Sequence, residues 1–129
     1  MGLFYVGCKV QNHSDSKKTV VIRRLMVDTG SEFTWIDGKA LTKIGLEPVK
    51  KDLQIRMANG SIITRSVGFA ILHVDKSFTT DEVVFAQSGD LQLLGCRALE
   101  GLNLRVDSRH KKLVAAGPII AATAIKVRR

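Results

Sequence analysis

The sequence contains few cysteine, proline and aromatic residues, and these scarcities exclude several classes of protein. Among 129 residues there are two cysteines and two prolines, and aromatic residues make up only 5%. Cys8 and Cys96 lie too far apart for a metal-ligand or redox spacing, so we expect two reduced, partly buried thiols. His13, His73 and His110 are scattered, and no glycine-rich nucleotide-binding loop is present. The sequence therefore predicts neither a metal nor a cofactor.

Long apolar runs are also missing. No segment approaches the roughly 20 apolar residues that a membrane helix needs. Residues 1–11 lack the basic start, apolar core and cleavage site of a signal peptide, so we expect a cytoplasmic protein with no membrane partner. At 129 residues and 45% apolar composition, the chain is predicted to form one domain with a real core.

The net charge of +8 raises the question of an acidic partner. The sequence has one Trp and one Tyr, so the basic residues lack the aromatic interleaving of many nucleic-acid-binding surfaces. The basic pairs are spread along the chain: Lys17-Lys18, Arg23-Arg24, Lys50-Lys51, Lys111-Lys112 and Arg128-Arg129. We expect a solvated basic surface, and nucleic acid is not the partner that we predict.

The apolar pattern predicts many short strands and closely spaced turns. Strands are predicted over residues 3–10, 19–27, 33–36, 53–57, 61–74, 79–85, 91–95, 102–106 and 112–114. Short helices are predicted over residues 37–44, capped by Asp37 and ended by Gly45, and over residues 96–100, ended by Gly101. This is the pattern of an all-β domain with a barrel-like or sandwich arrangement.

One stretch, Leu25 to Ser31, stands out chemically. An apolar strand runs into Asp28-Thr29-Gly30, which places the acid at a tight turn. Gly30 can adopt a backbone shape that other residues resist. The apolar residues before the turn anchor it in the core, so we expect a half-buried carboxylate that can share a proton with a neighbour.

Two later motifs complete the pattern. Asn59-Gly60 is a strong signal for a tight hairpin turn, and Leu93-Leu94-Gly95 leads into the second predicted helix. The order of the three motifs over residues 5–114 resembles the retropepsin-like, single-domain aspartic proteases and their bacterial relatives. The resemblance implies a closed, barrel-like acid-protease fold with one Asp-Thr-Gly loop per chain. It places the domain at residues 1–116 and a C-terminal tail at 117–129.

The resemblance also implies roles for particular residues. Catalytic roles fall on Asp28, Thr29 and Gly30, with Thr29 as a hydroxyl that cross-bonds two such loops. The middle hairpin becomes a flap over the substrate, and the apolar-apolar-Gly segment threads under the catalytic loop. Substrate contacts are implied for Ser31, Glu32, Met57, Ala58, Asn59, Gly60, Ser61 and Leu94. Ser31 is further expected to donate a hydrogen bond to the carboxylate, and no metal is required.

Two departures from the family pattern lie near the catalytic loop. Glu32 stands where these enzymes often carry an Asp that binds the substrate backbone. Cys96 stands where they often carry an Arg that pairs with that Asp, and Arg97 comes one position later. The flap tip also lacks the glycine-rich sequence of the retroviral enzymes.

The chemistry of this family makes a separate point about assembly. Aspartic proteases need two carboxylates that share a site and a proton. This chain has one Asp-Thr-Gly, and at Asp107-Ser108 an arginine, Arg109, replaces the glycine. We therefore predict a homodimer in which two copies of Asp28 meet about a two-fold axis and cut a peptide or protein substrate.

Two other functions remain open. The chain could be a non-catalytic dimer of the same fold that grips an extended peptide through a strand edge. It could also be a basic β-barrel that binds nucleic acid, with an affinity that depends on salt. Phe33 and Trp35 are predicted to belong to the core, and the apolar residues 119–125 are equally a loose end or a dimer strand.

Overall fold

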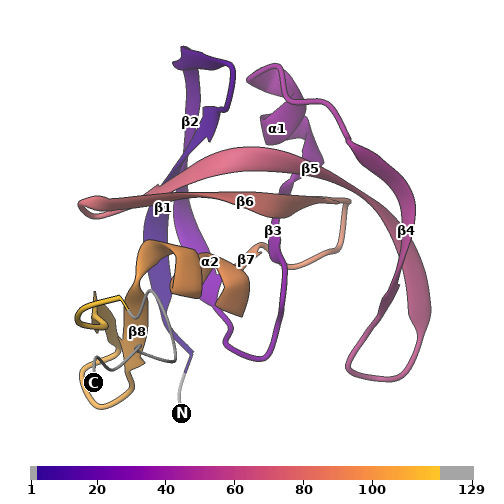
Figure 1. The fold of residues 1–129 in the computed structure, drawn as a ribbon. Coiled ribbons are helices and arrows are strands. Elements are labelled where there is room, and N and C mark those ends of the chain that lie inside the picture. The colour runs from indigo at the N-terminus through magenta and orange to yellow at the C-terminus, as the bar shows by residue number, and fades with distance from the viewer. Residues whose placement is uncertain (1–2, 120–129) are drawn as a thin grey trace, which may run out of the picture.

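The computed structural model describes residues 3–119 and folds most of them into strands (Figure 1). The strands are β1 (Tyr5–Asn12), β2 (Asp15–Val27), β3 (Thr34–Asp37), β4 (Lys50–Arg56), β5 (Ile62–Val74), β6 (Ser77–Ala86), β7 (Leu93–Leu94), β8 (Leu104–Asp107) and β9 (Lys112–Ala115). Within these residues the helices are α1 (Gly38–Lys43) and α2 (Cys96–Leu102). Residues 120–129 of the C-terminal tail, and with them all but the first residue of the apolar stretch 119–125, lie outside the described residues.

The main sheet closes on itself. Its order is β1-β2-β7-β3-β6-β5-β4, and β1 pairs with β5 as well as with β2. This second pairing turns the strands from β1 to β5 into a ring, with β4 added beside β5. Strands β8 and β9 form a separate antiparallel pair. The predicted all-β, barrel-like fold with short helices is confirmed.

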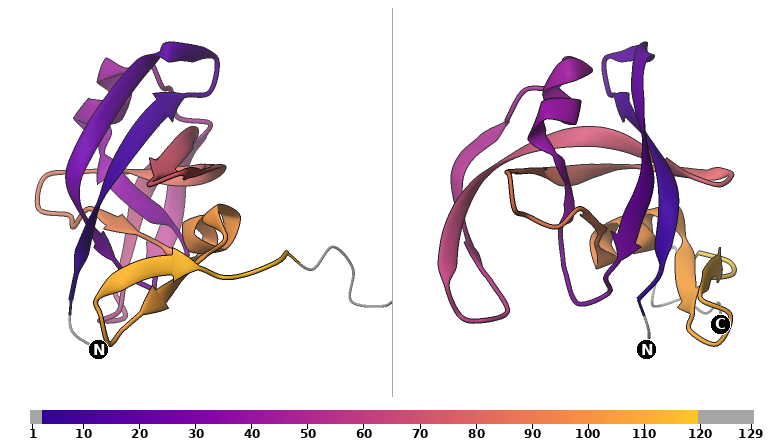
Figure 2. Two further views of the ribbon diagram at one scale, coloured as in Figure 1. Left: turned by 90° about the vertical axis from the view of Figure 1, so that its left-hand side faces the viewer. Right: turned by 180° about the vertical axis from the view of Figure 1, so that it is seen from behind.

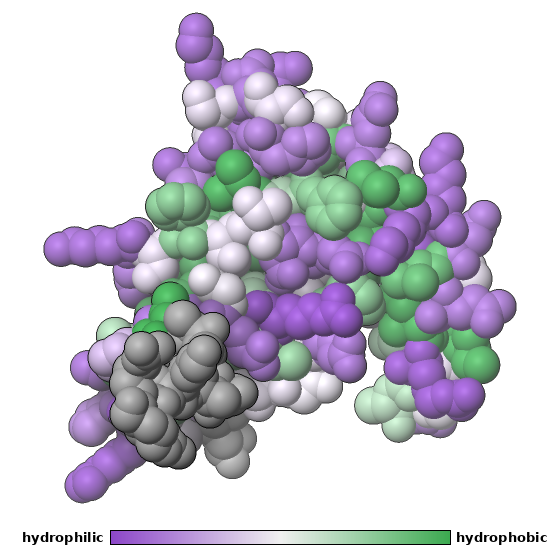
Figure 3. Space-filling model, in the orientation of Figure 1, coloured by the Kyte–Doolittle hydropathy of each residue, from purple (hydrophilic) through white to green (hydrophobic). Residues whose placement is uncertain are grey.

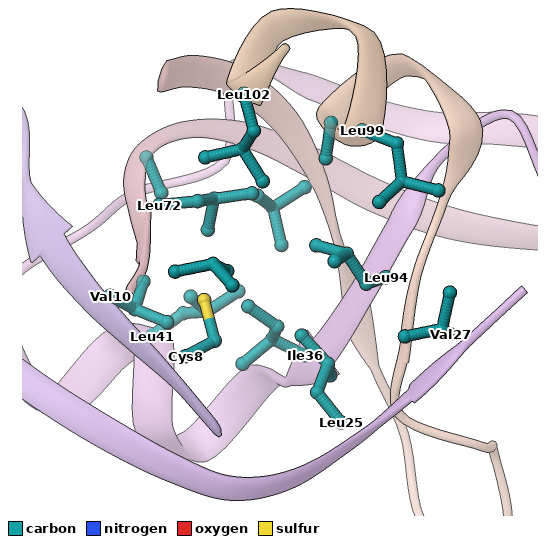
Figure 4. Packing of buried hydrophobic residues seen from close by; sticks show 14 of the residues in the cluster. Cys8, Val10, Leu25, Val27, Ile36, Leu41, Leu72, Leu94, Leu99 and Leu102 are labelled. Atoms are coloured by element: carbon teal, nitrogen blue, oxygen red, sulfur yellow. The ribbon is translucent and has the colours of Figure 1, made fainter. Parts of the chain in front are cut away.

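The ring encloses the larger of two apolar clusters. Leu25, Ile36, Leu72 and Leu94 are fully buried there, and α2 covers them with Leu99 and its neighbours (Figure 4). The residues reach this cluster from strands far apart in sequence, so their burial holds the ring together.

A smaller cluster lies beneath the hairpin of β4 and β5. Trp35, Val67, Val84 and Leu93 are buried in it, and Phe33 and Ile55 pack against it partly exposed. The prediction that Trp35 belongs to the core is confirmed.

The two cysteines are free, as predicted. Cys8 is buried in the larger cluster, and this burial raises the pKa of its thiol to about 12. Cys8 therefore stays protonated and unreactive at neutral pH. Cys96 is partly exposed at the first position of α2.

Several predicted boundaries were wrong, and those of β2 and α2 have a clear physical reason. Strand β2 begins at Asp15 rather than Thr19, because it pairs with β1 as far as the contact of Asn12 with Asp15. Gly101 lies inside α2 rather than ending it. The helix ends at Leu102 and is capped by Asn103, which adopts the left-handed conformation. A side chain at position 101 would collide with Thr79.

Candidate active site

Asp28 lies at the end of β2, on a loop that spans residues 28–33 and is here called the active-site loop. Strand β7 is inserted between the two strands that flank this loop. It pairs in parallel with β2, Val27 opposite Leu94, and antiparallel with β3, Trp35 opposite Leu93. The backbone N–H of Asp28 donates to the carbonyl of Leu94 over 3.0 Å. The predicted threading of Leu93-Leu94-Gly95 under the loop is therefore present.

The loop folds around its own carboxylate. The N–H of Gly30 donates to Asp28 Oδ1 over 3.0 Å, and the N–H of Ser31 donates to the Asp28 carbonyl over 3.2 Å. Asp28 is half-buried, as predicted, whereas Thr29 and Gly30 are exposed in the single chain. The turn thus presents the carboxylate and a hydroxyl at the surface of the molecule.

The hydrogen bond predicted from Ser31 to the carboxylate is absent. The Ser31 hydroxyl donates instead to the carbonyl of Phe33 over 2.8 Å. A hydroxyl has one proton to donate, so this bond leaves none for Asp28. Ser31 stabilises the curve of the active-site loop rather than the charge of the carboxylate.

The segment from Gly95 into α2 clamps the loop from below. The N–H of Cys96 donates to the Ser31 carbonyl over 2.7 Å, and that of Arg97 to the Glu32 carbonyl over 3.3 Å. The N–H of Gly95 donates to Thr34 Oγ1, a buried hydroxyl, over 3.0 Å. A side chain at position 95 would lie 2.8 Å from the Glu32 carbonyl oxygen, so only glycine fits beneath the loop.

Arg97 takes the place of the arginine that the family pattern has one position earlier. Its Nη2 lies 3.2 Å from Glu32 Oε2 and its Nη1 lies 3.5 Å from Glu82 Oε1. The guanidinium also lies over the ring of Phe33, 4.9 Å from its centroid. The Glu32 side chain is 69% exposed, so this pair orients Glu32 but contributes little to stability.

The hairpin of β4 and β5 ends in a tight turn, here called the flap tip (Met57–Ser61). The turn is not the two-residue type that Asn59-Gly60 favours, because only Gly60 has a positive φ, of 87°. Instead, the N–H of Gly60 donates to the Met57 carbonyl over 2.9 Å, and the N–H of Met57 donates to the Ser61 carbonyl over 2.8 Å. This is a three-residue loop with glycine in the left-handed position.

A cleft of about 630 Å³ separates the active-site loop from this hairpin, and the hollow beside the hairpin is visible in Figure 3. Its lining is a mixture of large apolar and polar side chains. It consists of Asp28, Gly30, Ser31, Glu32, Phe33, Trp35, Gln54, Ile55, Arg56, Met57, Ala58, Gly89, Asp90, Leu91 and Leu93. A cleft of this size fits a segment of extended peptide.

Apart from Leu94, the predicted catalytic and substrate-contact residues divide into two groups. Ser31, Glu32, Met57 and Ala58 line the cleft together with Asp28 and Gly30. Thr29 and the flap-tip residues Asn59, Gly60 and Ser61 are exposed but do not line the cleft of the single chain.

The prediction for Leu94 needs correction. Its side chain is fully buried in the larger cluster (Figure 4), so it cannot contact a substrate. Successive strand residues face opposite sides, and its neighbour Leu93 faces the cleft instead.

Several cleft residues were not predicted from the sequence. The alternation over residues 53–57 identifies Ile55 as inward-facing, which could have placed it in the cleft. Gly89, Asp90 and Leu91 could not be found in this way, because their place depends on the insertion of β7 between β2 and β3.

A second hollow, of about 650 Å³, lies between α1 and the end of β6. It is lined by residues such as Lys39, Lys43 and Phe85, and none of the predicted site residues reaches it. The predicted chemistry and this hollow are therefore separate.

The active-site loop lies at the same end of the molecule as the start of β1 and the β8–β9 pair (Figure 2). The N–H of Val27, the residue before Asp28, donates to the carbonyl of Phe4 over 3.0 Å. The sequence neighbours of Phe4, Leu3 and Tyr5, are large apolar residues that are 66% and 44% exposed. This end of the molecule thus combines the exposed Asp-Thr-Gly turn with exposed apolar residues.

Comparison with known proteins identifies a family that the chain matches. Residues 14–108 match the family described as aspartyl protease, which is well over half of the chain. The matched range contains the active-site loop, the flap tip and α2. No curated protein matches the sequence. Among the described residues, no helix is long and apolar enough to cross a membrane.

Proposed function

The chain belongs to the aspartyl protease family, and from this premise we propose that it is an aspartic endopeptidase whose catalytic centre forms from two copies of the chain. The observation that carries the proposal is the exposed Asp28-Thr29-Gly30 turn, held at one edge of a peptide-sized cleft. One chain supplies one such carboxylate, and the reaction needs two.

The proposed reaction uses the two carboxylates in opposite protonation states. The ionised Asp28 takes a proton from a water molecule, whose oxygen attacks the carbon of the peptide carbonyl. The protonated Asp28 of the other copy gives its proton to the carbonyl oxygen. The tetrahedral intermediate then collapses and its C–N bond breaks. The proton held by the first carboxylate goes to the leaving nitrogen, and one hydroxyl of the intermediate returns its proton to the second carboxylate, which restores the starting state of the pair.

Several features support the homodimer. Thr29 is exposed in the single chain, where a hydroxyl that bonds to a second loop would lie. Leu3 and Tyr5 are exposed at the same end as the active-site loop, and a partner would remove them from water (Figure 2). A two-fold axis through this end would bring the two turns together.

The cleft supports an extended peptide as the substrate. Phe33, Trp35, Ile55, Met57 and Leu93 give it apolar walls, which suit apolar side chains of the peptide. The flap tip borders the cleft through Met57 and Ala58 and would cover the bound peptide and exclude water.

Digestion of a mixed peptide library, followed by mass spectrometry, tests this proposal. We expect cleavage by the wild type and none by the Asp28→Asn variant, while Asp75→Asn, in the exposed turn between β5 and β6, cleaves as the wild type does. If folded, dimeric wild type cuts no peptide, the proposal is wrong. Retention of bound peptides would then favour the non-catalytic binding module.

The pH dependence provides a further test of the shared proton. Activity should decline at alkaline pH, because both Asp28 carboxylates then ionise and neither can protonate the substrate carbonyl. A rate that stays constant to strongly alkaline pH would contradict the proposed mechanism.

A further inference from the structure

Two segments that line the cleft are joined to each other by an ion pair. The first is the β4–β5 hairpin, and the second is the loop of residues 87–91, here called the cleft-wall loop. Arg65, on β5, donates from Nε to Asp90 Oδ2 over 2.7 Å and from Nη2 to Asp90 Oδ1 over 2.8 Å. The side chains of Arg65 and Asp90 are only 15% and 13% exposed.

Asp90 also organises the loop in which it lies. Its Oδ2 accepts a hydrogen bond from the N–H of Gln87 over 2.8 Å, and its own N–H donates to the Gln87 carbonyl over 3.0 Å. Gly89 adopts a φ of 91° within this turn. One carboxylate therefore both closes the turn and receives the arginine from the hairpin.

The pair differs from the ion pair that β4 of the same hairpin makes with β6. Lys50 contacts Glu82 through one bond of 2.9 Å, and its side chain is 51% exposed. Such exposed pairs contribute little, whereas a shielded two-bond contact between arginine and a carboxylate fixes distance and orientation together. The Arg65 guanidinium accordingly holds the pKa of Asp90 below its usual range.

We propose that Arg65 is a positioning residue for the peptidase. Through Asp90 it sets the position of the cleft-wall loop relative to the β4–β5 hairpin. The position of this loop in turn determines how well the bound peptide fits the cleft. The proposal rests on the proposed function for its effect on catalysis. Gly89, Asp90 and Leu91 line the cleft, so a shift of the turn changes the cleft itself. The active-site loop is held separately, Asp28 by β7 and Ser31 and Glu32 by α2, so the chemistry of Asp28 is expected to survive.

Peptide kinetics test this role. The Arg65→Gln variant should raise KM by about tenfold and change kcat by less than about threefold. Asp90→Asn should do the same, and the double variant should be no worse than either single one, since both remove one contact. Arg65→Lys, which keeps the positive charge, should raise KM less than Arg65→Gln does. Lys50→Gln, which removes the exposed pair on the same hairpin, should leave KM unchanged.

Hydrogen exchange separates this proposal from the proposed function, because it needs no catalysis. In Arg65→Gln the amides of residues 87–91 should exchange about tenfold faster than in the wild type, with those of β7 unchanged. If the wild type has no peptidase activity but the exchange is faster in Arg65→Gln, the positioning of the cleft-wall loop by Arg65 is supported and the proposed peptidase function is refuted. Unchanged exchange in the loop, or a fall in kcat with constant KM, would overturn the role of Arg65.

Discussion

The active-site loop and the flap tip face each other across the cleft but are held in different ways. The active-site loop is hydrogen-bonded to residues outside it. The N–H of Asp28 donates to the carbonyl of Leu94, and the N–H groups of Cys96 and Arg97 donate to the carbonyls of Ser31 and Glu32. The flap tip is closed by bonds among residues 56–61 alone.

The difference matches the two tasks proposed for these segments. Carboxylates that share a proton must keep their geometry, so a loop clamped by a buried strand and a helix suits them. A segment that admits and covers a peptide must open, and local bonds with little burial allow this. The Arg65–Asp90 pair lies between these cases, since it contacts the middle of the hairpin, where Arg65 pairs with Leu53, and not the tip.

The largest effect on stability is expected at Leu94. Leu94→Ala should lower the free energy of unfolding by about 4 kcal/mol, because it leaves a cavity beneath the active-site loop. The control is Leu91→Ala, a nearby leucine that is 64% exposed, which should change it by less than about 0.5 kcal/mol. Denaturant unfolding of both variants measures this, and equal effects would contradict the assignment of Leu94 to the core.

A smaller but still large effect is expected at Gly95. Gly95→Ala should cost about 3 kcal/mol, because the added carbon would press on the carbonyls of Phe33 and Glu32. Gly7→Ala is the matched control, since its nearest neighbour would be 3.8 Å away. If unfolding experiments find Gly95→Ala as stable as Gly7→Ala, the loop is not clamped from below.

The ion pair of Arg65 and Asp90 should contribute about 2 kcal/mol at neutral pH. The contribution should depend on pH, because the pKa of Asp90 is lower in the folded state. It is present above the pKa of the unfolded chain, near 4, and is lost as the pH falls through the lower, folded value. Denaturant unfolding of wild type and Arg65→Gln at several pH values should show a difference that shrinks in acid. A difference independent of pH would argue against the pair.

The smallest effect is expected at the flap tip. Asn59 accepts hydrogen bonds from both the N–H and the hydroxyl of Ser61, over 2.9 Å and 2.7 Å. Asn59→Ala should change the free energy of unfolding by only about 0.5 kcal/mol, because these bonds are local and exposed. Hydrogen exchange at the tip should nevertheless quicken. A loss above 2 kcal/mol would mean that the tip belongs to the core and does not move independently.

The sequence was most informative where local chemistry decides the structure. The turn at Asp28-Thr29-Gly30, the cap of α1 by Asp37 and the passage from Leu93-Leu94-Gly95 into α2 could all be predicted from neighbouring residues. These features depend on short-range hydrogen bonds and strand periodicity, which adjacent residues specify.

The remaining features depend on residues far apart in the chain. The inward side of Leu94 follows from the pairing of β7 with β2, and the contact of Arg65 with Asp90 joins positions 25 residues apart. Gly101 resembles a helix terminator in sequence, but it lies within α2, and its close approach to Thr79 explains why a glycine is needed there. No local pattern carries such information.

The central claim, that two copies of Asp28 form one catalytic centre, is tested most directly by a mixed dimer. Wild-type and Asp28→Asn chains with different tags are co-expressed, the mixed dimer is isolated, and its peptide cleavage is compared with that of the wild-type dimer. A mixed dimer of wild-type and Asp75→Asn chains serves as the control. We predict no cleavage by the first mixed dimer and full cleavage by the control. About half of the wild-type activity in the first, as expected of chains acting singly, would contradict the account.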